Sequence, residues 1–459
     1  MLESLADELI LEVFMHLRLV RKNSHEDHYE STGVEEARAS FSSLCFTSKR
    51  LSTIAQPMLY CDMVTSETGE GKRPVRISQA LRTLMRKPKL AYNIVYVEHM
   101  LPDCDSDECR KGCAHKSYYG SQDWKNHCAS MEPVACSVWT DPDLDKWKTL
   151  LNLYPEMAQL ALLLRLAPSI THIYADLFFH GTLAFVSLLA AHGKANGDHR
   201  GHDHGFKRLE KVCICSKTDY ESARPPIPWF SEFAAFLQSL PLRHYAHDEG
   251  MIGFRSPMTA GFELQRVETL HLHEFCDDFI LAATIIKACG MLKTLTFWPT
   301  QDYDDPDFST IYPALLAKKD TLEHVELSVD QLSSDHIPLM GSFANFQRLK
   351  YLRIPDLVLM DKPYGYSVEL IPWYEWTTFQ PWHRLSTLLP ASLEFLYLDG
   401  EMTHLSDKAD FLWDFVNDLP QLRRLRLFGT RSMYQGPFNR LSEEFAKRGI
   451  EFEKNRDRT

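Results

Sequence analysis

Cysteine and histidine side chains are concentrated between residues 101 and 140, at spacings that raise the question of a metal site. Thiolates and imidazoles close together can hold zinc in a tetrahedral site. The segment lacks the C-x2-C pair of a strong zinc motif, so we interpret this Cys-rich insertion as a polar segment with free thiols and expect no bound metal. The alternative is a metal-dependent sensor or enzyme. The residues concerned are Cys104, Cys109, Cys113, His115, His127, Cys128 and Cys136.

Two other groups of potential metal ligands lie in loop-like sequence. One loop holds four histidines among Gly and Asp residues, and nothing in it fixes their geometry. The other loop is acidic, but its match to calcium-binding spacing is incomplete. We interpret both as solvated loops without a metal. The two groups are His192, His199, His202 and His204, and Asp302, Asp304, Asp305 and Asp307.

The sequence contains no motif for catalysis or cofactor binding. It lacks the G-x-S-x-G nucleophile elbow, the phosphate-binding P-loop, the H-E-x-x-H zinc-protease motif and the dinucleotide-binding fingerprint. A cysteine–histidine nucleophilic pair stays open, since such residues meet only in space. We therefore expect no catalytic residue, no cofactor and no enzyme activity.

The composition of the whole chain limits its partners and its compartment. A length of 459 residues is too great for one core, so two or three units are expected. The net charge of −12 argues against a nucleic-acid partner, because neutralising phosphates needs a basic face. No apolar run is long enough to span a membrane, and the acidic N-terminal residues are unlike a secretory signal. The eleven cysteines are then expected to be reduced, in the cytoplasm or nucleus.

A strand core of the form L-x-x-L-x-L recurs along the chain, with helix-like segments between most copies. Strand followed by helix, repeated, predicts an α/β fold of parallel strands with covering helices. In the alternative, a doubly wound sheet, the strands would be continuously apolar. These strands alternate apolar and polar residues, which favours an irregular solenoid over residues 166–459 that resembles leucine-rich-repeat proteins. The copies begin at residues 170, 209, 242, 267, 292, 322, 349, 393 and 422.

The alternation also predicts which side chains line the open face of this sheet. Where Leu270 and Leu272 point into the core, His271 between them points the other way, and the same holds in every copy. The resulting lattice is rich in Tyr, Trp and Arg, which dominate binding hot spots, so we predict a protein-binding surface. The alternative is simply a solvated face. The predicted binding residues are His271, His273, Trp298, Tyr351, Arg353, Tyr397, Arg424 and Arg426.

Two further features of this region leave alternatives open. The arginines at 353, 424 and 426 could bind a phosphate on a substrate. An aromatic-rich insertion over residues 364–382 could be a partner-binding loop, or it could pack against the edge of the sheet.

The first sixty residues predict three short helices, over residues 4–17, 35–48 and 49–60, the last ending near Pro57. Ser4 can cap the first helix, and Asp7 lies near its positive end. That helix is apolar almost all round, so it needs cover from its own chain or from a partner protein. Three helices of this size bury little core by themselves.

These helices resemble an F-box, most closely that of the divergent F-box proteins of filamentous fungi. The first block to match is Leu5, Asp7, Glu8, Leu9, Ile10, Val13, Phe14 and Leu17, followed in order by LCFTSKRL over residues 44–51 and IAQPMLY over residues 54–60. The resemblance implies a three-helix domain over residues 1–60 that binds the Skp adaptor of a cullin-based ubiquitin ligase. The residues that it implies for adaptor contact are Leu5, Leu9, Ile10, Phe14, Leu17, Leu44 and Pro57.

Together these features predict the substrate-receptor subunit of a Skp–cullin–F-box ubiquitin ligase. The N-terminal helices would hold the adaptor, residues 61–165 would be a linker and capping region, and the solenoid would hold an unidentified protein substrate. The alternative is a non-ligase interaction scaffold with a degenerate F-box. It is suggested by Ala6, where the family usually has proline, and by the long connection between the first two helices. Neither hypothesis involves nucleic acid or a membrane.

Overall fold

The computed structural model describes fifteen stretches of the chain, and it divides into two compact units that are treated separately below. The units are Met1–Lys217 with Trp229–Pro241, and Thr218–Pro228 with Leu242–Thr459. The described residues are 5–17, 31–65, 76–99, 121–178, 185, 187–189, 206–217, 236–248, 263–275, 279–299, 308–328, 340–355, 385–399, 418–428 and 442–455.

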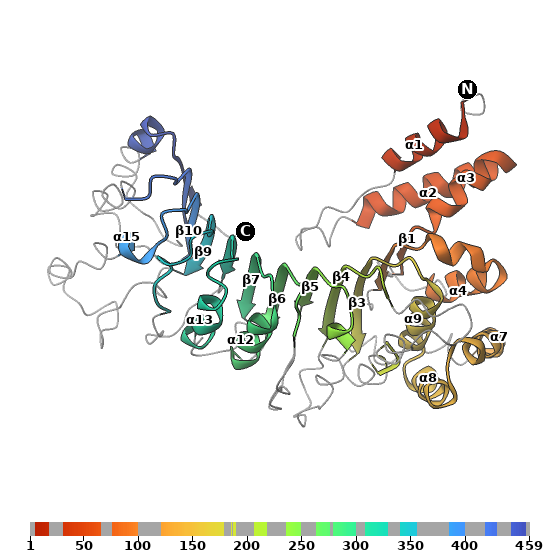
Figure 1. Ribbon diagram of the computed structural model, residues 1–459. Coiled ribbons are helices and arrows are strands. Elements are labelled where there is room, and N and C mark those ends of the chain that lie inside the picture. The colour runs from red at the N-terminus through yellow and green to blue at the C-terminus, as the bar shows by residue number, and fades with distance from the viewer. Residues whose placement is uncertain are drawn as a thin grey trace. The chain divides into compact units, whose positions relative to one another are not determined.

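The first unit begins with the three predicted helices, α1 (Asp7–Leu17), α2 (Ser31–Thr47) and α3 (Lys49–Leu59) (Figure 1). Helix α1 starts at Asp7, later than the predicted residue 4, and the carbonyl of Ala6 accepts the N–H groups of Leu9 and Ile10. Helix α2 starts four residues before the predicted position 35. Helix α3 does not end at Pro57 but continues to Leu59, since a proline in the last turn removes only one intrahelical N–H.

These three helices share a small apolar core. Ile10 and Phe14 of α1 are fully buried against Phe41 of α2 and against Leu51 and Ala55 of α3. The rings of Phe14 and Phe41 meet edge to face with their centroids 5.7 Å apart, a favourable arrangement for aromatic pairs. The faces of α1 and α3 are thereby fixed relative to each other.

Polar contacts secure the ends of the same helices. The hydroxyl of Ser48 accepts a hydrogen bond from the N–H of Leu51 and caps α3. One residue into α3, Arg50 donates from Nε to Asp7 Oδ1 at 2.7 Å and from NH2 to the carbonyl of Leu5 at 2.6 Å. The N-terminus of α1 is therefore held by α3 as well as by the core.

The region predicted as a linker and cap contributes strands and a helical layer. Strand β1 (Asp62–Val64), which was not predicted, pairs in parallel with β2 (Tyr96–His99). A 3-10 helix, η3 (Pro88–Asn93), precedes β2. Helix α4 (Arg76–Arg86) lies between β1 and η3 in the chain. The parallel ladder thus begins about a hundred residues before position 166.

The second half of the Cys-rich insertion is helical rather than a polar loop. Helix α7 (Gln122–Val138) is capped by Ser121 and buries Trp124, His127 and Met131. Helices α8 (Asp141–Leu153) and α9 (Pro155–Leu166) follow it. The sequence did not predict helix α7 because it carries Pro133 and many polar residues, and its apolar face is recognised only from its tertiary packing.

The nine predicted strand copies are all confirmed, as β3 to β11, and β12 is an addition. Successive strands within each unit pair in parallel. The first unit holds β3 (His172–Phe178) and β4 (Lys211–Lys217). The second holds β5 (His244–Asp248), β6 (Thr269–Phe275), β7 (Thr294–Pro299), β8 (His324–Leu327), β9 (Tyr351–Pro355), β10 (Phe395–Asp399), β11 (Arg424–Phe428) and β12 (Glu451–Asn455).

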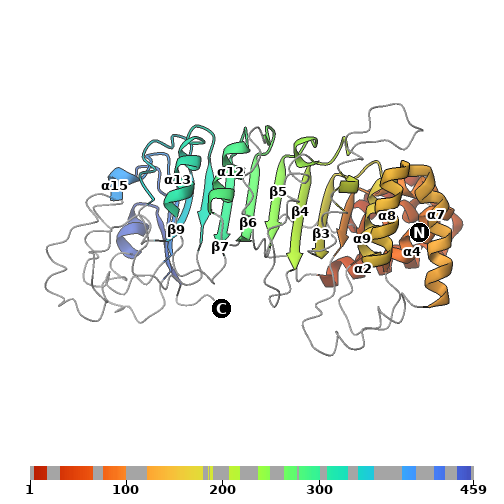
Figure 2. The ribbon, with the colours of Figure 1, turned by 90° about the horizontal axis from the view of Figure 1, so that it is seen from below.

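Helices cover one face of the strands in the second unit. Helix α12 (Phe279–Ala288) and helix α13 (Phe308–Leu316) lie on the same side of β6 and β7 in both ribbon views (Figure 1, Figure 2). The ring of Phe297 in β7 packs against Phe279 of α12 and Phe308 of α13, with centroids 5.4 and 6.2 Å apart. The fold is therefore α/β, with parallel strands and covering helices in a solenoid-like arrangement. A short helix, α15 (Leu385–Leu388), precedes β10.

The same pair of backbone bonds recurs at the start of β2 to β4 in the first unit and of β6 to β11 in the second. The carbonyl of Arg243 accepts the N–H groups of Glu268 and Thr269, at 2.8 and 3.0 Å, and the carbonyl of Glu268 accepts those of Lys293 and Thr294. Because the strands β6 to β11 all start on the same bonds, equivalent residues stand side by side. Each repeat therefore places its side chains in register with the next.

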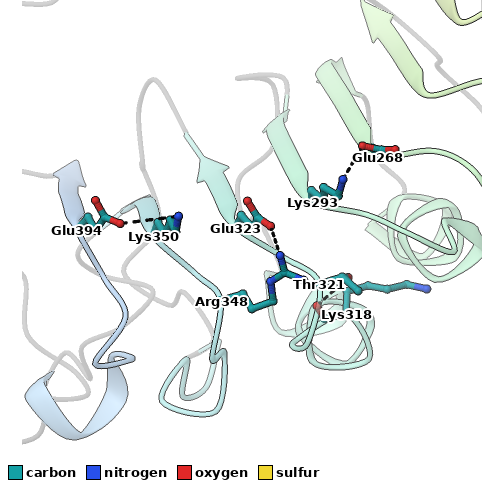
Figure 3. Close-up of polar contacts among 8 residues, drawn as sticks. All are labelled: Glu268, Lys293, Lys318, Thr321, Glu323, Arg348, Lys350 and Glu394. Carbon is teal, nitrogen blue, oxygen red and sulfur yellow. Dashed lines mark hydrogen bonds and ion pairs between the residues drawn. The ribbon is translucent and has the colours of Figure 1, made fainter. Parts of the chain in front are cut away.

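Charges of alternating sign lie at this position across the second unit. Lys293 Nζ lies 2.7 Å from Glu268 Oε2, and Lys350 Nζ lies 3.9 Å from Glu394 Oε1 (Figure 3). Opposite charges directly across from each other favour this register over a shifted one. The residues that precede β6 to β11 are, in order, Glu268, Lys293, Glu323, Lys350, Glu394 and Arg423.

Buried histidines in the first unit predict a loss of stability in acid. Burial lowers the pKa of His99 to about 4, and burial, helped by Arg82, lowers that of His127 to about 4. Below pH 6.5 the unfolded chain takes up protons that these folded imidazoles accept only near pH 4. The stabilisation is therefore present above pH 6.5 and is lost as the pH falls toward 4.

We expect the free energy of unfolding to drop between pH 7 and 5.5 by roughly 1 kcal/mol for His99 alone. Denaturant titrations across this range measure the slope, and His99→Gln should reduce it. The interval from pH 8 to 7 is the internal control, with little change expected. An unchanged slope in His99→Gln would contradict the assignment.

Candidate functional site

The open face of the second unit carries rows of chemically similar side chains. In register, Tyr351 of β9 stands beside Phe395 of β10, and Arg353 stands beside Tyr397. The next strands continue these rows with two arginines and then two glutamates. We call the following set the polar face: His324, Glu326, Tyr351, Arg353, Tyr397, Asp399, Arg424, Arg426, Glu451 and Glu453.

Arg353 bridges two carboxylates at the centre of the polar face. Its NH1 lies 2.7 Å from Glu326 Oε1 and its Nε lies 2.8 Å from Asp399 Oδ2. The hydroxyl of Ser328 donates to Asp399 at 3.3 Å. The three charged side chains are only 16%, 15% and 7% exposed, so water screens this network weakly.

The electrostatics of this network favour its charged state. Burial opposes ionisation of Glu326, but His324 and Arg353 outweigh it and hold the pKa of Glu326 below its usual value. Burial also opposes the charge on Arg353, yet Asp399 and Glu326 raise the pKa of the guanidinium. Arg353 therefore links three strands, β8, β9 and β10, through paired charges.

Arginine–glutamate pairs connect the last two strands. Arg424 Nε donates to Glu451 Oε2 at 2.7 Å, and Arg426 Nε lies 3.1 Å from Glu453 Oε2. Hydrogen bonds to Tyr397 and Glu451 raise the pKa of Arg424, and the bond from Arg424 lowers the pKa of Glu451. All three arginines of the polar face are thus engaged by carboxylates.

Aromatic rings form a continuous stack beside these pairs. The rings of His324 and Tyr351 are nearly parallel, 5° apart, with centroids 3.8 Å from each other. Tyr351 in turn contacts the ring of Tyr397 at 4.9 Å, and Arg426 lies over that ring at 5.9 Å. Burial, with the nearby Glu326, raises the pKa of Tyr351 and keeps its phenol neutral.

The other three predicted binding residues form a separate aromatic group on β6 and β7. The rings of His273 and Trp298 stack with centroids 4.4 Å apart, and His271 meets His273 at 6.0 Å. His273 is buried, whereas Trp298 and His271 are half-buried. The structure therefore brings the predicted residues together as two clusters rather than one.

Sequence reasoning missed the acidic residues of β12. The strand core L-x-x-L-x-L is absent there, and only Ile450 and Phe452 mark its apolar side. The alternation of these two residues with Glu451 and Glu453 was the available signal, and it is too short to distinguish a strand from a loop. The carboxylates of Glu326 and Asp399 lay on the predicted face, but their pairing with Arg353 depends on side-chain geometry.

The residues predicted for adaptor contact separate into buried and exposed sets. Ile10 and Phe14 lie in the core of the three helices and are not part of their exposed surface, and their contact with the adaptor stays a prediction. Leu5 and Leu44 are partly buried against that core, and Pro57 is half-buried. The side chain of Leu17 lies outside the described residues. The outer surface of α1 instead presents Leu9, Leu11, Val13 and Met15, which are 55%, 44%, 41% and 45% exposed.

The structure offers no metal site among the residues that it describes, and no helix among them is long and apolar enough to cross a membrane. Nε2 of His127 lies 3.3 Å from Gln159 Oε1, inside the first unit. Cys128 and Cys136 lie on α7 as free cysteines, half-buried and exposed respectively. The remaining candidates of the sequence analysis lie outside the described residues. They are Cys104, Cys109, Cys113 and His115, the histidines at 192–204, the aspartates at 302–307 and the aromatic insertion at 364–382.

Comparisons with known proteins add no family to this description. No protein-family model matches the chain, and a search of curated proteins finds no match.

The burial of the Arg353 network predicts a large effect of its removal. Arg353→Met leaves two poorly solvated carboxylates without their partner, so we expect a loss of about 2–4 kcal/mol in the free energy of unfolding. Arg353→Lys should not restore the lost stability, because an ammonium cannot span both carboxylates as a guanidinium does.

The matched control is Arg348→Met. Arg348 also lies 2.7 Å from a glutamate, Glu323, but its side chain is 59% exposed, so the loss should be under about 1 kcal/mol. Denaturant titrations compare the two variants. Equal losses would contradict the importance assigned to burial.

Proposed function

We propose that this chain is a substrate-receptor subunit of a Skp–cullin–F-box ubiquitin ligase, acting in the cytoplasm or nucleus. Helices α1 to α3 bind the Skp adaptor, and the open face of the second unit binds a protein substrate. The chain itself catalyses no step. It raises the effective concentration of substrate lysines near the ligase by holding both partners at once.

The observation that carries this proposal is the outer surface of α1. Four apolar side chains of an eleven-residue helix are more than 40% exposed, although two others on the same helix anchor it to α2 and α3. Phe46 of α2 adds a side chain that is 86% exposed. Apolar side chains concentrated on one short helix mark a protein-binding surface more often than chance exposure does.

The substrate part of the proposal is supported by the open face. Its tyrosines, arginines and tryptophan are held by stacking and ion pairs, so binding would cost little side-chain entropy. Tyr, Trp and Arg are the residue types that contribute most to binding at interfaces.

Adaptor capture by full-length chain tests the proposal. We expect wild-type chain to retain purified Skp adaptor and Leu9→Glu/Val13→Glu to lose at least about tenfold in affinity, because two charges would be desolvated at the contact. Both side chains are exposed, so the free energy of unfolding should change by less than about 0.5 kcal/mol.

The control variant is Ile280→Glu/Met291→Glu, which places two charges on exposed apolar positions of the second unit, 69% and 51% exposed. It should capture the adaptor like the wild type. If the wild type captures no adaptor while remaining folded, the proposal fails and the non-ligase scaffold becomes the better account. If the Leu9/Val13 variant binds normally, α1 is not the contact.

A further inference from the structure

The charge of the polar face points to the class of segment that it recognises. Its three guanidinium groups face four carboxylates, those of Glu326, Asp399, Glu451 and Glu453, which leaves one carboxylate in excess of the arginines. The sequence alone suggested that the arginines could bind phosphate. In the structure every one of them already has a carboxylate partner from a neighbouring strand.

A phosphate would have to displace these partners. Phosphoserine carries between one and a half and two negative charges near neutral pH, and it would enter a site where carboxylates already exceed cations. Breaking the buried pairs of Arg353 would also leave Glu326 or Asp399 poorly solvated. Recognition of a phosphorylated segment by these arginines is therefore disfavoured both by charge repulsion and by the loss of a partner for a buried carboxylate.

A cationic segment meets the opposite conditions. Glu451 and Glu453 keep 51% and 32% of their side-chain surface exposed, so their carboxylates are open to a second cation while one side contacts arginine. On the same face, Tyr397 is buried but the ring of Tyr351 is only half-buried and offers apolar surface for the stem of a lysine or arginine. Exposed carboxylates and a partly exposed ring on one face suit a basic side chain by charge and by apolar contact.

We infer that the polar face binds an unphosphorylated protein segment that carries lysine or arginine next to apolar residues. The inference rests on the proposed function, in which this face is the substrate site. The substrate would be recognised through a basic linear segment, and phosphorylation of that segment would weaken its binding.

Selection from a phage library of random short peptides on immobilised full-length chain tests this inference. We expect the enriched peptides to be net positive and to bind Glu451→Gln/Glu453→Gln about five- to tenfold more weakly. In that variant the three arginines face only two carboxylates, so these groups carry an excess of one positive charge. The variant should therefore bind phosphoserine forms of the same peptides better than wild-type chain does, an improvement that structural damage would not produce.

The matched control is Glu323→Gln/Glu394→Gln. It removes two carboxylates that precede strands of the same sheet but pair with Arg348 and Lys350 instead of with the polar face. Basic peptides should bind it within about twofold of wild type, since distant surface charges act weakly at physiological salt.

Three outcomes would overturn the inference: acidic or charge-neutral enriched peptides, no enrichment at all, or equal weakening by the control variant. Adaptor capture is measured on the same preparations. Loss of adaptor capture with intact basic-peptide selection would refute the ligase proposal alone, and the reverse result would refute only the inference about the polar face.

Discussion

In-register parallel pairing of successive strands is the constraint on which the other features of this protein depend. A carbonyl before the strand accepts two successive N–H groups of the next repeat, and this pair of bonds recurs from Cys61 to Thr171 in the first unit and from Arg243 to Glu394 in the second. Because parallel pairing places equivalent positions side by side, a residue type repeated along the chain becomes a row in space. The apolar rows form the core beneath α12 and α13, and the alternate rows form the open face.

The same constraint explains why the polar face is rigid. Arg353 reaches a carboxylate on each neighbouring strand only because Glu326 precedes it and Asp399 follows it in the strand order. The resulting network is mostly buried, where an unpaired charge is costly, whereas the Glu268–Lys293 pair is more exposed, at 28% and 41%, and contributes less to stability. The contact distances in the Arg353 network and in the Glu268–Lys293 pair are similar. Burial therefore explains why the Arg353 network stabilises the fold, whereas the Glu268–Lys293 pair mainly favours the strand register.

Much of this fold follows from the sequence, and the failures have physical causes. The nine strand copies were predictable because period-two alternation and the leucine spacing agree. Strands β1 and β12 were not, since DMV and EFEKN are too short or too polar to show a period. Helix α7 was obscured by Pro133 and its polar residues.

The candidate sites were predictable to a lesser degree. Alternation placed Arg353 and Tyr351 on the open face, but it carried no information about which charges pair. Along α1, the apolar stripe did not distinguish Ile10, which is buried, from Leu9, which is exposed, because an almost wholly apolar helix has no polar face to orient it. Only the contacts with Phe41, Leu51 and Ala55 decide which side points inward.

The central claim is that α1 to α3 form an adaptor-binding module, and calorimetric titration of purified Skp adaptor into full-length chain tests it most directly. The account predicts a saturable one-to-one interaction whose enthalpy becomes more negative as the temperature rises, because burial of the apolar residues on α1 lowers the heat capacity. The absence of saturable binding by folded chain, or binding without a negative heat-capacity change, would contradict it.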